Sequence, residues 1–276
     1  MIMLDGLGVN PEFESAKQEL ENRRREYASL LAEYDELTGT VRRNLETEYM
    51  LQIGRRENQV FALQVRAQQL KREISLYQAA QNRRETISDT AVREIIAKEF
   101  AEYKAKLDEL QKKVREAEAH YLSPKLSPAE SKAVKELYRD LVKKLHPDLN
   151  PDLPEALKQL WLRIVAAYKR SDWMELNILA DMVDALLEDG NVVVPVPDRM
   201  EEIQEEQKRI SQKMADLRNR MEQLRREPPF VYEKLLADAA AVKEKREELD
   251  ELRENFEKHI EELTRLRDSL RGGNDA

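Results

Sequence analysis

Two long stretches of this sequence contain no proline and repeat apolar residues at heptad spacing. No proline occurs between Pro11 and Pro124 or between Pro154 and Pro195. Because proline breaks the interior of a helix, both stretches can form long helices. Alternating steps of three and four residues place one apolar stripe along a helix, where it faces a partner helix. The chain is therefore predicted to be all-α, with coiled-coil helices as its main elements.

Residues 12–121 are predicted to form a long helical hairpin. The apolar seam of its first helix, over 12–86, lies at Tyr27, Leu30, Tyr34, Leu37 and Val41, and then at Val60, Leu63, Ala67, Leu70, Ile74 and Tyr77. Gly39 and Gly54 lie between the two parts and can loosen the helix and shift its register. The second helix, over about 89–121, is predicted to begin at Ser88 or Asp89. Its seam is Ile96, Tyr103, Leu107, Leu110, Val114, Ala117 and Tyr121.

Residues 199–271 are predicted to form a C-terminal coiled coil in two helices. The seam of the first is Ile203, Ile210, Met214, Leu217, Met221 and Leu224. After Pro228-Pro229 the second continues with Leu235, Val242, Leu249, Leu252, Phe256, His259, Leu263, Leu266 and Leu270. Residues 188–198 are predicted to be a linker, and 1–11 and 272–276 to be tails. Pairing within one chain and a homo-oligomer through the coiled coils would both satisfy these seams.

Composition supports this architecture and excludes several classes of function. Charged residues make up 37% of the chain and aromatic residues 6%, which is typical of long helices. The net charge of -8, with both signs interspersed, argues against a nucleic-acid binder and against an anionic membrane surface as partner. No apolar run is long enough for a membrane span, and the N-terminus is too short and acidic for a signal peptide. A cytoplasmic location is expected, and without cysteine there is no disulfide or Cys-based zinc site.

Residues 122–187 differ from both arms and contain both tryptophans. They are predicted to form a small helical domain inserted between the coiled coils. Ser127, Pro128 and Glu130 predict a capped helix start. The helix that follows has a buried stripe at Val134, Leu137, Tyr138, Leu141 and Leu145 and a basic stripe at Lys132, Lys135, Arg139 and Lys143, which Glu136 and Asp140 dilute.

This helix is predicted to stop at His146-Pro147-Asp148, because proline disfavours helical backbone in the residue before it. A second helix, over about 152–171, carries Leu157, Leu160, Trp161, Ile164, Ala167 and Tyr168. Its length lets it pack antiparallel to the first, with residues 146–154 as the loop. Residues 171–187 continue as helix, for which core packing is the only expected role.

These two helices together resemble a known family. The segments YRDLVKKLHPDLNP (138–151) and WLRIVAAYKRSD (161–172) are similar to the second and third helices of the J domain, including its His-Pro-Asp tripeptide. The resemblance covers roughly residues 121–173, within what looks like a bacterial-type, DnaJ-like protein with flanking coiled coils. It implies a co-chaperone in protein folding that binds a DnaK-type heat-shock chaperone and stimulates its ATP hydrolysis.

The resemblance also implies roles for individual residues. His146, Pro147 and Asp148 would form the activating loop. The rest of the chaperone-binding surface would be Lys135, Arg139, Lys143, Lys144 and Asn150, whose cations steer towards an acidic partner. The core of the J-like domain would be Tyr138, Leu141, Leu145, Trp161, Ile164 and Tyr168.

The sequence departs from the family pattern at several points. The first J-domain helix is not recognisable, and Tyr121 and Leu122 are expected to substitute for it. Leu149 follows the tripeptide where lysine is common, and Asp140 lies within the basic stripe. Both changes weaken the docking electrostatics. The Gly/Phe-rich and Cys-rich client-binding segments of the largest J-domain proteins are missing.

The chain shows no pattern of an enzyme. Its three histidines, at 120, 146 and 259, have no clustered carboxylates around them, and no phosphate loop, nucleophile elbow or metal spacing occurs. No catalytic, cofactor-binding or metal site is therefore expected. Two functions stay open: a J-domain co-chaperone, or a structural scaffold whose J-like domain no longer activates a chaperone. The intact tripeptide favours the first; the client and the process served stay open.

Overall fold

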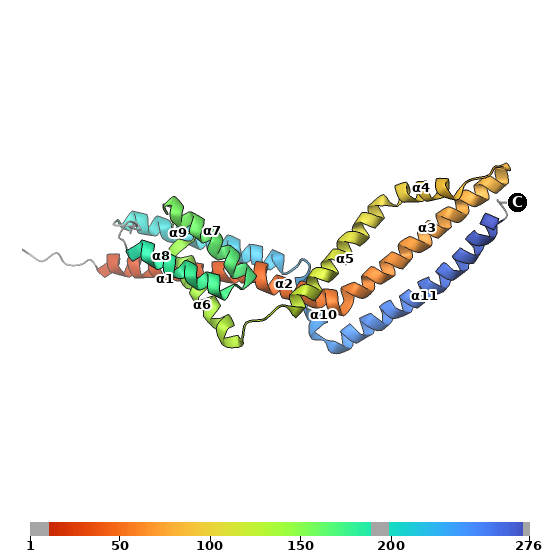
Figure 1. Ribbon diagram of the computed structural model, residues 1–276. Helices are drawn as coiled ribbons and strands as arrows, with labels where there is room; N and C mark the ends of the chain where they lie inside the picture. The colour runs from red at the N-terminus through yellow and green to blue at the C-terminus, as the bar shows by residue number, and fades with distance from the viewer. Residues whose placement is uncertain (1–10, 189–198, 273–276) are drawn as a thin grey trace, which may run out of the picture. The chain divides into compact units, whose positions relative to one another are not determined.

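The computed structural model describes residues 11–188 and 199–272, and these residues form helices joined by short turns with no strand among them (Figure 1). The prediction of an all-α protein is confirmed. The predicted tails and the linker fall on residues 1–10, 189–198 and 273–276, outside the described residues. Within the described ranges, none of the helices combines the length and apolarity that crossing a membrane requires.

The chain packs as two compact units. Of the described residues, unit 1 contains 11–43, 124–188 and 199–230, and unit 2 contains 44–123 and 231–272. Residues 12–121, expected as one hairpin, thus contribute to both units. The physical reason is that the first arm packs mainly against the C-terminal arm along most of its length, and only its part in unit 2 also packs against the residues that follow it, 89–122.

Helical backbone runs without a turn from Pro11 to Arg83. It consists of α1 (Pro11–Glu36), η1 (Leu37–Val41), α2 (Arg42–Tyr49), η2 (Met50–Gly54) and α3 (Arg55–Arg83). The segments η1 and η2 are π-helical turns, and they contain Gly39 and Gly54. A π-helical turn adds a residue to the helix and so changes which side chains share a face. The expected register shift therefore occurs by widening the helix without breaking it.

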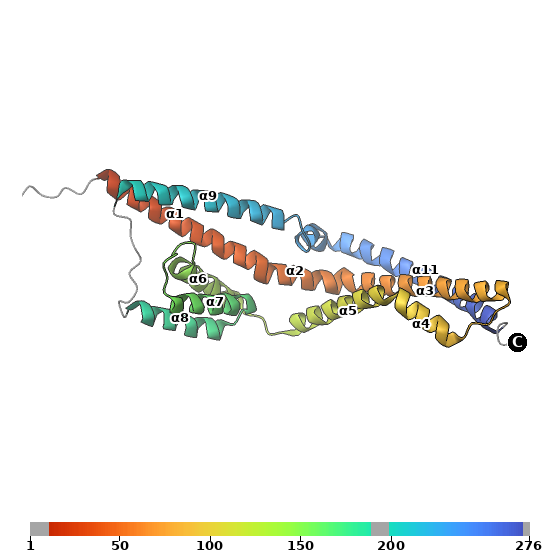
Figure 2. The same ribbon diagram turned by 90° about the horizontal axis from the view of Figure 1, so that it is seen from above.

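In unit 1, α1 lies alongside α9 (Met200–Leu224) in both views (Figures 1 and 2). The two helices are parallel, because Gln207 donates to the carbonyl of Ala16 and Arg218 to Glu26, pairs that are 191 and 192 residues apart. The predicted α9 seam is buried except for the partly exposed Leu224. On α1 the buried residues are Leu20, Tyr27, Ala28, Leu31 and Ala32, so that Leu31 replaces Leu30 in the seam.

The rest of unit 1 is a group of three helices, α6 (Pro128–Leu145), α7 (Glu155–Arg170) and α8 (Trp173–Glu188). Helix α6 packs against α1, α7 and α8. The segment expected to continue the preceding helix over 171–187 is instead the separate helix α8, since α7 ends at Arg170 with Ser171 as its C-cap, and α8 buries Leu176, Leu179, Ala180 and Val183. Its expected role in core packing is therefore confirmed.

Unit 2 pairs α3 with α11 (Ala239–Gly272), again in parallel, since the ion pairs Arg56–Asp250 and Glu73–Arg267 each join residues 194 positions apart.

The turns of unit 2 match the sequence prediction only in part. Ser88 is the N-cap of α4 (Asp89–Glu99), and its hydroxyl accepts from the backbone amide of Ala91. The single helix expected over 89–121 is broken at Phe100, where α5 (Ala101–Leu122) begins. The short η3 (Phe230–Tyr232) and α10 (Glu233–Ala237) follow the two prolines, and the single helix expected after them is broken at Asp238, where the backbone is extended, before α11 begins.

Candidate functional site

Helix α6 positions the candidate loop. Ser127 and Glu130 form the predicted capping box at its start, with Pro128 in the first turn. Its amphipathic pattern buries Val134, Tyr138, Leu141, Val142 and Leu145, so Val142 belongs to the core although it was not predicted there, and the predicted Leu137 is only partly buried. The helix ends at His146, whose backbone is extended (φ -65°, ψ 128°), as expected for a residue before proline.

The loop after α6 is held in one conformation by its own backbone. The amides of Leu149 and Asn150 both donate to the carbonyl of His146, at 3.0 and 2.9 Å. The side-chain amide of Asn150 donates to the carbonyl of Lys143 at 2.9 Å, which satisfies a carbonyl in the last turn of α6. Leu149, Asn150 and Leu153 are buried, whereas Pro147 is exposed. The loop is thus anchored through its buried residues and presents the proline to solvent.

His146 is neutral at pH 7. Burial lowers its pKa below the ordinary value, and the nearby carboxylates of Asp148 and Asp35 offset this only in part. Its Nδ1 accepts from the backbone amide of Asp148 at 3.1 Å, which places the ring proton on Nε2. The ring lies edge-on to Trp161 of α7, with 5.3 Å between ring centroids. The imidazole therefore joins the loop to both helices of the α6–α7 hairpin.

Asp148 is bound by both arms of unit 1. Its carboxylate accepts from the Tyr27 hydroxyl of α1 at 2.8 Å and from the Lys213 ammonium of α9 at 2.7 Å. Burial alone would raise the pKa of Asp148, but the hydrogen bonds from Lys213 and Tyr27 outweigh it and the pKa is lowered. Burial and the same carboxylate raise the pKa of Tyr27. We call Asp148, Tyr27 and Lys213 the Asp148 clasp.

The basic residues of α6 meet acidic partners within unit 1. Lys135 pairs with Glu36 at 2.6 Å and Lys143 with Glu21 at 2.7 Å, both acids being on α1. Lys144 pairs with Asp184 of α8 at 2.6 Å. Arg139 is exposed and has no ion-pair partner among the described residues. One of the four predicted docking cations therefore stays unpaired.

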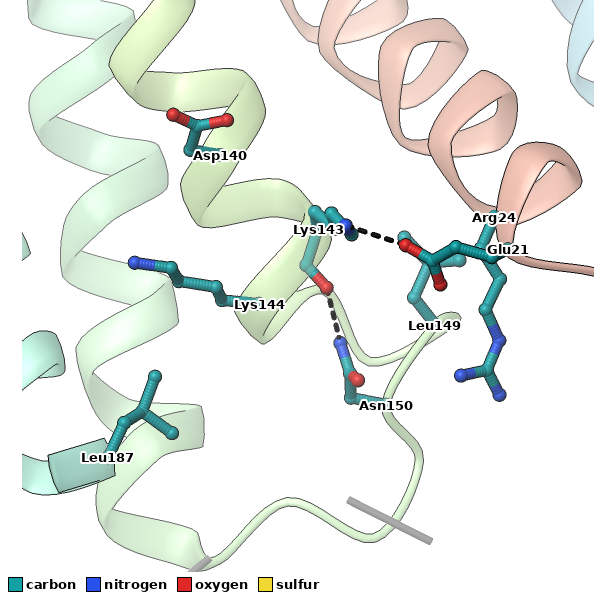
Figure 3. A pocket seen from close by; sticks show the side chains of 8 residues that line it. All are labelled: Glu21, Arg24, Asp140, Lys143, Lys144, Leu149, Asn150 and Leu187. Carbon is teal, nitrogen blue, oxygen red and sulfur yellow. Dashed lines mark hydrogen bonds and ion pairs between the residues drawn. The ribbon is translucent and has the colours of Figure 1, made fainter. Parts of the chain in front are cut away.

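A pocket of about 440 Å³ lies beside the loop, between α1, α6 and α8 (Figure 3). In this view Glu21 reaches from α1 to Lys143, and Asn150 lies below them. The residues that line the pocket are Glu21, Arg24, Asp140, Lys143, Lys144, Leu149, Asn150 and Leu187. Three cations and two carboxylates line the pocket, and Glu21 is already paired with Lys143, so the charges of the lining largely offset one another.

The six predicted core residues are all buried: Tyr138, Leu141, Leu145, Trp161, Ile164 and Tyr168. The rings of Tyr138 and Tyr168 stack with 3.7 Å between centroids. The Tyr138 hydroxyl donates to Asp35 of α1 at 2.5 Å, a partly buried polar contact between the hairpin and the arm. The aromatic core thus fixes the α6–α7 hairpin and ties it to α1.

The expected roles of Tyr121 and Leu122 are wrong. Tyr121 is 60% exposed and Leu122 80% exposed, and both belong to unit 2. Besides α7 and α8, the helix that packs against α6 is α1, near the start of the sequence. Hydrophobicity at the end of α5 therefore does not indicate a place in the core of the hairpin.

The site includes residues that the sequence did not single out, namely Glu21, Asp35, Glu36 and Lys213. Tyr27 was predicted only as a seam residue. A partial signal existed, because Lys213 directly precedes the seam residue Met214 and Tyr27 lies on the seam of α1. Within the described residues no group of three or more His, Asp and Glu side chains could hold a metal ion.

The chain was compared with known protein families, curated proteins and solved structures. None of the family models, curated proteins or solved structures with which the chain was compared matches it.

Proposed function

We propose that this protein is a J-domain co-chaperone that binds a DnaK-type heat-shock chaperone and stimulates its ATP hydrolysis. The observation that carries the proposal is the position of His146-Pro147-Asp148, which ends α6 and opens the loop of a helical hairpin. The tripeptide is fixed by His146 against Trp161 and presents Pro147 to solvent. A rigid loop with exposed residues suits docking to a protein partner, because little ordering entropy is lost on binding.

The charge of α6 supports the same partner class. Lys135, Arg139, Lys143 and Lys144 form a basic surface on α6 that ends next to the loop, and such a surface steers association with an acidic protein. The chaperone would carry out the chemistry, and this chain would supply the contact that accelerates it. The coiled-coil arms would then target or oligomerise the protein, and we place the activity in the cytoplasm.

A second function is favoured by one specific observation. Asp148 already has two partners within unit 1, and two of the docking lysines pair with α1. A scaffold protein whose J-like domain no longer activates a chaperone would tolerate such contacts without consequence. The two functions differ in whether the tripeptide affects ATP hydrolysis by a chaperone.

The test is single-turnover ATP hydrolysis by a purified DnaK-type chaperone from the same organism, with and without the full chain. We expect the wild-type chain to accelerate hydrolysis and His146→Gln to abolish the acceleration. The matched control is His259→Gln, the same chemical change on α11 of unit 2, and it should retain full stimulation. Equal rates with wild type and without it would favour the scaffold.

A further inference from the structure

The proposed activating carboxylate is occupied by the chain's own arms. Asp148 accepts hydrogen bonds from Tyr27 of α1 and Lys213 of α9, at 2.8 and 2.7 Å. A carboxylate that already accepts a phenol and an ammonium must lose these donors before it can accept others in the same directions. The Asp148 clasp therefore competes with any external donor for this group.

The basic surface of α6 is occupied in the same way. Glu21 and Glu36 of α1 pair with Lys143 and Lys135, and Figure 3 shows Glu21 lying against Lys143 at the pocket. Asp35 of α1 accepts from the Tyr138 hydroxyl. Helix α1 thus offers α6 three carboxylates, the charge that an acidic protein partner would bring. It occupies the basic surface as such a partner would.

We infer that α1 and α9 mask the chaperone-docking surface, so that a chaperone binds only after it displaces Tyr27, Lys213 and the acidic side chains of α1 from α6 and its loop. This inference rests on the proposed function and adds its regulation. The resting protein is a weak stimulator whose activity rises when these contacts are removed.

The strength of the individual contacts makes the masking reversible. The side chains of Asp148 and Lys213 are 43% and 32% exposed, and those of Lys143 and Lys135 are 44% and 41% exposed. Ion pairs with this much solvent contribute little individually, because water competes for both partners. A partner that supplies carboxylates to the lysines and a hydrogen-bond donor to Asp148 can therefore replace these contacts one by one, without unfolding the α1–α9 pair whose seam is buried.

A second clasp in unit 2 provides a matched control. Tyr77 of α3 donates to Asp89 at 2.6 Å, and Arg271 of α11 pairs with the same carboxylate. Asp89 lies in the first turn of α4, away from the α6 loop in the sequence and in the other unit. Removing this Asp89 clasp makes the same chemical change without touching the proposed docking surface.

The test compares the double variants Tyr27→Phe/Lys213→Met and Tyr77→Phe/Arg271→Met in the single-turnover assay, over a range of co-chaperone concentrations. We expect the first to lower the concentration for half-maximal stimulation by about five- to tenfold, because the population with a free Asp148 rises. The second should match wild type. Circular dichroism verifies that both variants keep their helical content.

The outcomes separate this inference from the proposed function. If all three proteins stimulate with the same concentration dependence, masking is overturned while the co-chaperone function stands. If neither wild type nor the first variant stimulates at any concentration, the proposed function fails and the inference fails with it. A gain in both double variants would also overturn masking, because the effect would then not be specific to Asp148.

A reversible tether tests the same point by replacing one masking contact, the Lys135–Glu36 ion pair, with a covalent link. The chain has no cysteine, so Glu36→Cys/Lys135→Cys introduces one pair of thiols between α1 and α6. Joining them with a thiol-cleavable bismaleimide should abolish stimulation, and cleavage with reductant should restore it in the same sample. Full stimulation by the tethered protein would show that α1 need not move.

Discussion

The two units are built on the same plan and differ in what their polar clasps hold. In each unit an N-terminal and a C-terminal arm run in parallel, α1 with α9 and α3 with α11. In each, a tyrosine from the first arm and a cation from the second bind one aspartate of the intervening segment. The clasp is therefore a general means by which this chain attaches its middle segments to its arms.

The placement of the aspartate distinguishes the two clasps. Asp89 lies in the first turn of α4, where a carboxylate is favourable beside the free amides at the helix N-terminus. Asp148 lies in a loop between helices, next to the neutral His146 and the basic α6. The helix N-terminus thus explains why position 89 is an aspartate. No such local feature explains the aspartate at position 148, apart from its clasp and the docking role that we propose.

The largest expected effect contrasts the aromatic packing of the two units. Tyr138 is fully buried in unit 1, whereas Tyr103 of unit 2 is 41% exposed. Tyr138→Ala should lower the free energy of unfolding of unit 1 by about 3–5 kcal/mol, because it leaves a cavity in the core. Tyr103→Ala should cause a much smaller loss in unit 2.

Urea unfolding can follow the units separately. Both tryptophans, Trp161 and Trp173, belong to unit 1, so their fluorescence reports that unit, while circular dichroism reports the helices of both. A shift of the circular dichroism transition in Tyr138→Ala without any shift in tryptophan fluorescence would mean that this aromatic core does not stabilise unit 1.

A smaller effect is expected from pH. Burial lowers the pKa of His146 in the folded protein, so below the ordinary value near 6.5 the unfolded chain binds a proton that the folded chain does not. The contribution of His146 to the stability of unit 1 is complete above that value and is lost progressively as the pH falls below it, towards the lowered pKa of the folded protein. Urea unfolding monitored by tryptophan fluorescence between pH 7.5 and 5 should show this loss.

The matched variant for the pH series is His146→Gln, which removes the titrating group. Its unfolding midpoint should fall less over the same pH range than that of the wild type. An identical pH dependence in both proteins would contradict the assignment of this titration to His146.

Much of the fold follows from local and periodic signals in the sequence. The capping box at Ser127, the stop at His146 before Pro147 and the seam of α9 all depend on residues close together along the chain. Helix propensity, capping and heptad spacing specify such features without knowledge of the partner. The α6 core could be predicted for the same reason, because its buried residues share one face of one helix.

The choice of partners could not be predicted in this way. A heptad seam specifies that a helix has an apolar partner but does not name it, so the parallel pairing of α1 with α9 left no local signal. The clasp of Asp148 joins residues 121 and 65 positions apart, at single polar contacts that no periodicity marks. The break at Phe100 was missed because neither proline nor glycine accompanies it.

The most direct test of the account applies one substitution to both clasps. Asp148→Asn and Asp89→Asn make the same isosteric change in units 1 and 2, and each is added to the DnaK-type chaperone in the single-turnover assay. We predict that Asp148→Asn no longer stimulates ATP hydrolysis by the chaperone, whereas Asp89→Asn still does. Equal stimulation by the two variants, whether kept or lost in both, would contradict the claim that the loop at 146–148 activates the chaperone.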